Sequence, residues 1–216
     1  MRKIYSIIVL VCFVFFSCKR SSQEIKVTDK KIVDQRKSEF ENGDIIFQTS
    51  LSSQSKAIQS ATKSKYSHCG ILFDEAGWKV YEATSPNVTM TPLEDWIARG
   101  ENGKFVIKRL KKSNLIADNY KKFCDAANLF YQKKYDAEFN WSNEKVYCSE
   151  LIWKTFKTGL GVELGQPQKL KDFDLSNKLV KQKMKERYGK NIPLDEIVIS
   201  PQSIFESEQL ETIKSN

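Results

Sequence analysis

The chain has 216 residues, of which 40% are hydrophobic and 29% charged, a composition that predicts one globular domain and excludes a wholly disordered chain. Lys and Arg exceed Asp and Glu by 8, but they are scattered, which argues against nucleic-acid binding and favours loose attraction to anionic lipid or cell-wall polymer. The sequence has a single histidine and no CxxC pair, so we expect neither a metal nor a cofactor.

Residues 1–17 have the pattern of a bacterial lipoprotein signal peptide. Two basic residues precede an almost entirely apolar run at 4–16, which is shorter than the roughly 20 residues of a membrane-spanning helix. Ser17 directly before Cys18 resembles a lipobox, although Phe15 stands where leucine is usual. The alternatives are an ordinary signal peptide and a poor membrane anchor, either of them with an accidental cysteine. We expect an acylated Cys18 that anchors the protein in the bacterial cell envelope, periplasmic or associated with the outer membrane.

The composition after the signal peptide divides the chain into two further segments. Residues 18–39 are polar, charged and without periodicity, which predicts a tether, and residues 40–216 are predicted to form the folded domain. The first elements expected are, in chain order, a strand at 43–47, a helix at 53–64, a hairpin of strands at 66–73 and 78–83, a helix opened by Thr91 and Pro92, and a strand at 104–110.

The second half of the domain is richer in predicted helix. A longer helix begins at Ser113, an aromatic loop follows at 135–141, and a helix at 149–158 ends at Gly159. The polar stretch 161–195 shows no clear periodicity, and the last expected elements are a strand at 197–199 and a helix after Pro201. The mixed order of hairpin strands and helices favours the α+β class.

Cys148 stands where the chain passes into a helix with an apolar stripe. The helix dipole and the free N–H groups at that end stabilise a thiolate and can also bind an oxyanion. Taken alone, a buried structural cysteine is the better interpretation of this position, because a nucleophile also requires a base.

His68 is the candidate base. It lies on a predicted strand, where alternation places Cys69 on the opposite face and therefore in the core. On the following strand, Glu82 alone interrupts a β-rich run with a charge. A carboxylate on a paired strand can hold the imidazole tautomer and stabilise its protonated form. An incidental histidine and a solvent-facing strand glutamate are the alternatives.

Four segments together resemble the circularly permuted NlpC-type papain-like hydrolases, and among them the YiiX-like lipoproteins. They are Gly43–Phe47, Tyr66–Ile71, Tyr81–Ala83 and Tyr147–Leu151, and the tail Ile199–Pro201 resembles the family as well. In this superfamily the histidine strand precedes the cysteine helix, the reverse of the order in papain. The present sequence has that permuted order over roughly residues 40–160.

The resemblance implies that Cys148 is the nucleophile, that His68 is the general base and then the acid, and that Glu82 orients the imidazole. It implies a small antiparallel sheet or half-barrel packed against the cysteine helix. Tyr66 takes the place of an aromatic residue near the oxyanion or the substrate, although packing explains it equally well. Asp44 opens the first strand and is more readily structural.

The remaining cysteines leave one question open. Once Cys12 leaves with the signal peptide and Cys18 carries lipid, Cys69, Cys124 and Cys148 remain. An odd number in an oxidising compartment allows either a Cys69–Cys124 disulfide or two free thiols, and one thiol is left over in both cases.

The leading functional hypothesis is a cell-envelope cysteine hydrolase, an amidase or endopeptidase that acts on peptidoglycan-derived peptides through a thioester on Cys148. A lipid hydrolase or acyltransferase, as in the related lecithin–retinol acyltransferase-like proteins, would use the same Cys–His pair, and a catalytically inactive envelope-binding lipoprotein is the third alternative. We expect a small peptide, amino-acid amide or acyl substrate and no nucleic acid, and the oligomeric state stays open. A polar pocket beside Cys148 would indicate a peptide, and a long apolar groove would indicate an acyl chain.

Overall fold

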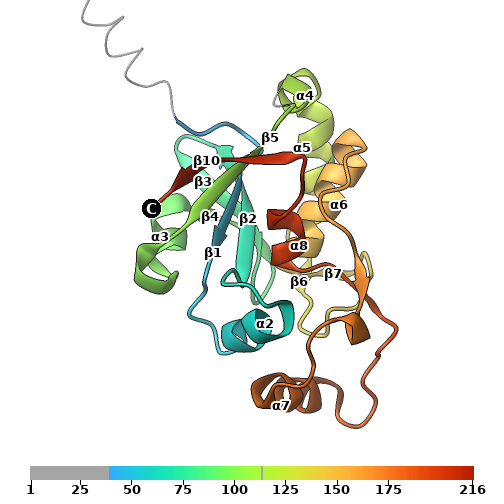
Figure 1. Cartoon of the computed structure of the whole chain (residues 1–216). Helices are drawn as coiled ribbons and strands as arrows, with labels where there is room; N and C mark the ends of the chain where they lie inside the picture. Colours follow the sequence, from blue (N-terminus) through green and yellow to red (C-terminus); the bar gives the residue numbers. More distant parts are fainter. Residues whose placement is uncertain (1–38, 113) are drawn as a thin grey trace, which may run out of the picture. The chain divides into compact units, whose positions relative to one another are not determined.

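One antiparallel sheet of six strands positions the candidate site (Figure 1). The computed structural model describes residues 39–112 and 114–216, and Phe40–Asn216 make up one compact unit. The expected signal peptide, the acylated Cys18 and nearly all of the tether lie outside the described residues. None of the helices in the described part has the length and apolar character that crossing a bilayer requires.

The strands of the main sheet follow the order β10-β5-β1-β2-β3-β4, and all neighbours are antiparallel. They are β1 (Ile45–Gln48), β2 (His68–Asp74), β3 (Trp78–Ala83), β4 (Val88–Pro92), β5 (Val106–Leu110) and β10 (Leu210–Ser215). Two small pairs stand apart from this sheet: β6 (Lys134–Tyr135) with β7 (Lys145–Val146), and β8 (Gln168–Lys169) with β9 (Ile197–Val198).

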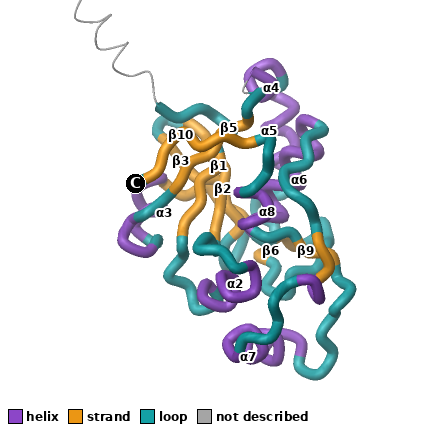
Figure 2. Tube along the Cα trace, viewed as in Figure 1, coloured by secondary structure: helices purple, strands orange, loops and turns teal. Residues whose placement is uncertain are grey.

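Helices cover both faces of the sheet (Figure 2). They are α2 (Ser55–Thr62), α3 (Leu93–Ala98), α4 (Asn114–Asp118), α5 (Tyr120–Asn128), α6 (Cys148–Leu160), α7 (Lys178–Tyr188) and α8 (Pro201–Phe205), with short 3-10 turns at Glu101–Gly103 and Leu170–Asp172. Helix α3 lies on one face, whereas α5, α6 and α8 lie on the other; α2 packs beside α7 at one end of the domain (Figure 1).

Alternation along the strands divides the core into two clusters. In β1, Ile45 and Phe47 belong to the larger cluster under α5 and α6, whereas Ile46 belongs to a smaller cluster that includes Trp96 of α3. Both clusters are well shielded, since these four side chains have no exposed surface. The sheet is therefore buried on both faces, and a residue at the end of a strand can contact groups from either layer.

The expected α+β architecture is confirmed, and the β2–β3 hairpin turns at the predicted position. The helix predicted from Ser113 is in fact two helices, α4 and α5, which are separated at Asn119. The Asn119 side chain donates a hydrogen bond to the Leu115 carbonyl and its backbone leaves the helical region, so the apolar stripe continues across a break. Pro92 is likewise the last residue of β4 and precedes α3, instead of being its first helical residue.

Among the elements longer than three residues, β4, β10 and α7 were not predicted from the sequence, and neither were the two-residue strands β6, β7 and β8. Strands β4 and β10 carry few buried side chains, because β4 is at one edge of the sheet and β10 is at the other. Helix α7 buries only Val180 and Met184, so its apolar period is too sparse to recognise within the polar stretch 161–195.

Gly70 of β2 tests the packing between the hairpin strands. A Cβ atom there would lie 2.3 Å from the Val80 Cγ1 atom and 2.9 Å from the Tyr81 carbonyl oxygen. Gly70→Ala should therefore lower the free energy of unfolding by about 1–3 kcal/mol, measured by urea denaturation. Gly161→Asn is the control, because this left-handed helix cap has nothing within 4 Å of its Cβ position. Equal stability of the two variants would contradict this account.

Candidate active site

The nucleophile candidate, Cys148, is the first residue of α6, and its two neighbours are tied to the same backbone segment. The Tyr147 hydroxyl accepts a hydrogen bond from the Ile199 N–H (2.9 Å), and the Ser149 hydroxyl donates to the Ile199 carbonyl oxygen (2.8 Å). The Glu150 carboxylate accepts from the Tyr147 N–H (3.3 Å) and so closes the first turn of the helix. The helix start is thus fixed from both sides of the cysteine.

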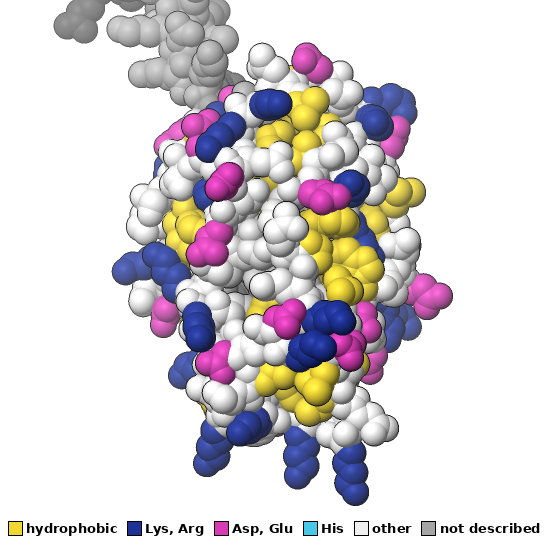
Figure 3. Space-filling model, turned by 45° about the vertical axis from the view of Figure 1, so that its right-hand side comes forward, with side chains coloured by type: hydrophobic (Ala, Val, Ile, Leu, Met, Phe, Trp, Pro, Cys, Tyr) yellow, Lys and Arg dark blue, Asp and Glu magenta, His cyan; other side chains and the backbone are white. Residues whose placement is uncertain are grey.

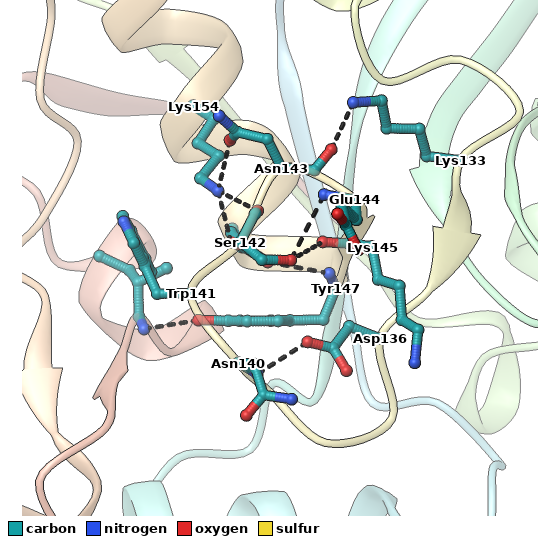
Figure 4. A network of polar contacts seen from close by, with 12 residues as sticks. Lys133, Asp136, Asn140, Trp141, Ser142, Asn143, Glu144, Lys145, Tyr147 and Lys154 are labelled. Atoms are coloured by element: carbon teal, nitrogen blue, oxygen red, sulfur yellow. Dashed lines mark hydrogen bonds and ion pairs between the residues drawn. The ribbon is translucent and has the colours of Figure 1, made fainter.

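The loop before Cys148 is held by a polar network (Figure 4). The Lys154 ammonium, on the second turn of α6, donates to the carbonyl of Ser142 and to the Asn143 side chain, and it pairs with Glu150 at 2.7 Å. Nearer the start of the loop, the Asp136 carboxylate accepts hydrogen bonds from the backbone N–H groups of Glu138 and Asn140. Burial raises the pKa of Glu150 to about 7, although its contacts with Lys154 and the Tyr147 N–H favour the carboxylate.

The candidate base and its partner come from neighbouring strands. The His68 Nε2 atom, at the start of β2, lies 2.5 Å from the Glu82 Oε2 atom of β3. This leaves the other ring nitrogen for the thiol, and the His68 ring stacks on Trp96 at 5.8 Å between centroids. The structure therefore brings His68 and Glu82 together, and His68 is also in contact with Cys148.

The Glu82 carboxylate has no exposed surface, and each of its two oxygens has hydrogen-bond partners. Besides His68, it accepts hydrogen bonds from the Thr91 hydroxyl (2.5 Å), the Trp96 indole (3.1 Å) and the Arg99 guanidinium. A buried carboxylate is stable only when it is paired and hydrogen-bonded in this way. These three donors come from β4, α3 and the residue after α3.

The electrostatics favour a thiolate–imidazolium pair. Burial alone would lower the pKa of His68, but its contacts with Cys148 and Glu82 raise the pKa to about 10. Burial would likewise raise the pKa of Glu82, but His68, Thr91 and Arg99 lower it to about 2. A hydrogen bond from Cys69 lowers the pKa of Cys148 well below its usual value, and His68 lowers it further against the effect of burial.

Cys69 and Tyr66 occupy different environments from each other. Cys69 is fully buried, as expected, but its thiol also contacts the sulfur of Cys148. Tyr66 is buried between the rings of Phe47 and Phe205, at 5.9 Å and 4.4 Å between centroids, and does not line the hollows beside Cys148. Its observed place is that of a packing residue.

The other residues considered from the sequence have structural partners. Both carboxylate oxygens of Asp44 accept from Arg109, at 2.7 Å and 2.8 Å, which makes Asp44 part of a buried ion pair. Cys69 and Cys124 are free thiols, and the structure has no bond between them.

Two hollows meet at the Cys148–His68 pair, and they differ in chemistry. An apolar groove of about 720 Å³, its open side included, is lined by Cys148 and by side chains of α2, α7 and β9. A polar hollow of about 970 Å³ is lined by His68, Arg99 and a set of hydroxyl and amide side chains: Gln48, Ser50, Ser52, Ser67, Thr84 and Ser85.

Gln54 and Tyr135 line both hollows, and sequence reasoning did not single them out. The Gln54 amide donates to the Tyr135 hydroxyl (2.8 Å), and its oxygen accepts from Arg187 of α7 (2.8 Å). Arg99 was missed as well, although it completes the Glu82 site. All of them lie in or next to segments without strong periodicity, so only the folded chain reveals that they converge.

The chain is similar to known proteins in both sequence and fold. A family described as permuted papain-like amidases, of the YaeF/YiiX type and the C92 family, matches residues 39–214. The uncharacterized protein YiiX of Escherichia coli K12 is 49% identical over 174 residues, which cover 80% of this chain and 85% of that protein. The crystal structure of metalloprotein YiiX from Escherichia coli O157:H7 aligns with a TM-score of 0.79 at 49% identity, over 83% of this chain and 99% of that one.

Since that crystal structure is described as a metalloprotein, we looked for groups of metal-binding side chains in this chain. Among residues 39–112 and 114–216, no three His, Cys, Asp or Glu side chains are grouped so that they could hold an ion. The one imidazole is already in contact with Glu82 and Cys148. No metal site is therefore assigned within the described residues.

Glu82→Gln tests the electrostatic account. A neutral amide no longer stabilises the imidazolium, so the pKa of His68 should fall, the Cys148 thiolate should lose its counter-charge, and the pKa of Cys148 should rise. The pH of half-maximal alkylation of Cys148 by iodoacetamide should therefore increase by at least about one unit, measured by peptide mass spectrometry. The exposed Glu94→Gln in α3 is the matched control. A Glu82→Gln profile that coincides with the control would refute the assigned role.

Proposed function

The chain belongs to the permuted papain-like amidases of the YaeF/YiiX family, and on that premise we propose that it hydrolyses an amide bond through a thioester on Cys148. The single observation that carries the proposal is the array of Cys148, His68 and Glu82, in which His68 contacts both the buried Cys148 thiol and the buried Glu82 carboxylate, so that the pKa of the thiol is lowered and that of the imidazole is raised. A nucleophile, a proton donor and an orienting carboxylate are the groups that acyl transfer requires.

The reaction follows from the placement of these groups. The Cys148 thiolate attacks the carbonyl carbon, and free backbone N–H groups at the start of α6 bind the oxygen that becomes negative. The His68 imidazolium gives its proton to the leaving nitrogen as the C–N bond breaks. Neutral His68 then takes a proton from water, which attacks the thioester and releases a carboxylic acid. Glu82 stays ionised throughout and compensates the charge on the imidazole.

We further propose that the enzyme is a lipid-anchored protein of the cell envelope. This rests on the signal-peptide pattern of residues 1–17 and on Cys18, which lie outside the described residues. A scattered positive charge, with 35 Lys and Arg against 27 Asp and Glu, is compatible with anionic lipid or cell-wall polymer nearby.

Two substrate classes fit the chemistry, namely a peptidoglycan-derived peptide and an acyl lipid. The groove beside Cys148 is apolar, and this observation favours the lipid hydrolase or acyltransferase alternative. The intact charged array argues against an inactive binding protein, since a buried ion pair without function carries a desolvation cost.

Replacement of either reacting group should abolish turnover. Cys148→Ala removes the nucleophile and His68→Ala removes the proton carrier, so each should lower kcat by about a thousandfold or more with an unchanged circular dichroism spectrum. A panel of muropeptides and N-acyl amides is the substrate set, with product release followed by mass spectrometry. Cys124→Ala, remote from this pair, is the matched control and should keep full activity. Turnover retained in Cys148→Ala or His68→Ala would exclude the mechanism.

A further inference from the structure

The thiols of Cys69 and Cys148 are in contact, although they belong to different elements. Cys69 is the second residue of β2, Cys148 is the first residue of α6, and these two elements pack against each other. Alternation along β2 points the Cys69 side chain into the larger core cluster, which also contains Cys148. There the Cys69 thiol and the Cys69 backbone N–H both hydrogen-bond to the Cys148 sulfur. Both residues are free thiols, so the fold holds a second reduced sulfur against the nucleophile.

The hydrolysis proposed above makes no use of the Cys69 sulfur. The thiolate of Cys148 has its counter-charge in His68, and the Cys69 thiol only adds a hydrogen bond. A hydroxyl at this position would donate that hydrogen bond more strongly, because an S–H group is a weak donor. What a second thiol adds, and a hydroxyl does not, is the capacity to form a disulfide with an oxidised neighbour.

The two sulfurs differ in their access to solvent and in their state of ionisation. Cys148 lines the apolar groove, and its lowered pKa favours the thiolate, which is the form that peroxides oxidise. Cys69 has no exposed surface and lines neither hollow, and burial raises the pKa of its thiol. An oxidant that enters from solvent therefore meets Cys148 and not Cys69.

The groove gives such an oxidant a route to Cys148. Helix α7 forms one of its walls, and this helix is at the lower end of the domain in Figure 1. Figure 3 shows hydrophobic side chains at the surface of this end, above Lys and Arg side chains that project from it. A small uncharged molecule such as hydrogen peroxide needs no polar partner along an apolar wall, so the groove does not hold it back.

We propose that Cys69 resolves the oxidised nucleophile: a peroxide oxidises Cys148, and Cys69 then joins it in a reversible disulfide. In the first step the Cys148 sulfur attacks a peroxide oxygen, the O–O bond breaks, and the leaving oxygen takes the proton of His68. The sulfur has then lost two electrons and is a sulfenic acid, and the peroxide is reduced to water or an alcohol.

The second step consumes the sulfenic acid. The Cys69 sulfur attacks the Cys148 sulfur, the S–S bond forms, the S–O bond breaks, and the hydroxide leaves as water with the proton of the Cys69 thiol. A dithiol reductant supplies the two electrons that return the disulfide to two thiols. Without a resolving thiol, the sulfenic acid goes on to sulfinic and sulfonic acids, which a dithiol does not reduce.

The first step also prepares the second. Burial raises the pKa of Cys69, and the neighbouring Cys148 thiolate raises it further through its hydrogen bond and its charge. A sulfenic acid lacks that charge, so oxidation of Cys148 removes part of what keeps Cys69 protonated. Cys69 therefore stays a neutral thiol during turnover and gains nucleophilic character only when the nucleophile has been oxidised.

Titration of the purified full-length protein with hydrogen peroxide tests the pair. Remaining thiols are alkylated, the chain is digested, and the peptides are identified by mass spectrometry. The wild type should yield a Cys69 peptide joined to a Cys148 peptide, and dithiothreitol should release both thiols. Absence of the joined peptides, or Cys148 joined to a different cysteine, would overturn the proposal.

Cys69→Ala and Cys69→Ser remove the resolving thiol. After peroxide and then dithiothreitol, the fraction of Cys148 that iodoacetamide can alkylate should be at least about tenfold lower in these variants than in the wild type, because sulfinic and sulfonic acids accumulate. Cys124→Ala removes a free thiol on α5 and is the matched control, which should recover like the wild type. Equal recovery in the wild type and in both Cys69 variants would overturn the proposal, and the joined wild-type peptides test it even if neither variant folds.

The disulfide is measured without a substrate, so its failure is distinct from failure of the proposed hydrolase. The loss of activity on oxidation rests on the thioester mechanism: hydrolysis should fall in proportion to the joined peptides and return with dithiothreitol. If the joined peptides form and no amide is hydrolysed, the redox pair stands and the proposed function fails. If hydrolysis depends on Cys148 and no joined peptides form, the mechanism stands and the redox pair is overturned.

Discussion

The contact between the buried Glu82 carboxylate and His68 is the interaction on which the remainder of the site depends. A carboxylate with no exposed surface is costly unless donors surround it, and here Thr91, Trp96 and Arg99 complete the shell. The layer formed by β4 and α3 thus has a chemical role as well as a packing role. It keeps Glu82 ionised, which keeps the imidazole protonated and the sulfur anionic.

The array joins the two halves of the core. Glu82 and Trp96 belong to the α3 side of the sheet, whereas Cys148 belongs to the α6 side, and His68 reaches both because it begins a strand. Cys69, the next residue along, faces the larger core and contacts the Cys148 sulfur. A residue at the end of a strand can therefore contact groups on both faces of the sheet. This contact does not depend on whether the histidine strand or the cysteine helix comes first along the chain.

The central array was predictable from the sequence because its signals are local. Alternation located His68 and Glu82 on paired strands, and the helix start located Cys148; the structure brings all three together. The aromatic role considered for Tyr66 finds no support in its packed position. Gln54, Tyr135 and Arg99 could not be predicted, because they meet only through the tertiary fold. Helix α7 was missed since it buries only two side chains, and the same sparseness leaves it free to display its charge.

The hydrogen bonds that join Tyr147 and Ser149 to the Ile199 backbone make the position of Cys148 depend on the carboxyl-terminal part of the chain. Tyr147 and Ser149 take their positions from a backbone segment that is synthesised about 50 residues later. A chain that stops short of Ile199 retains every reacting group but lacks the two hydrogen bonds that hold the neighbours of the sulfur. The alignment of the Cys148 sulfur with the His68 imidazole therefore draws on contacts that form only after the chain has been synthesised as far as Ile199.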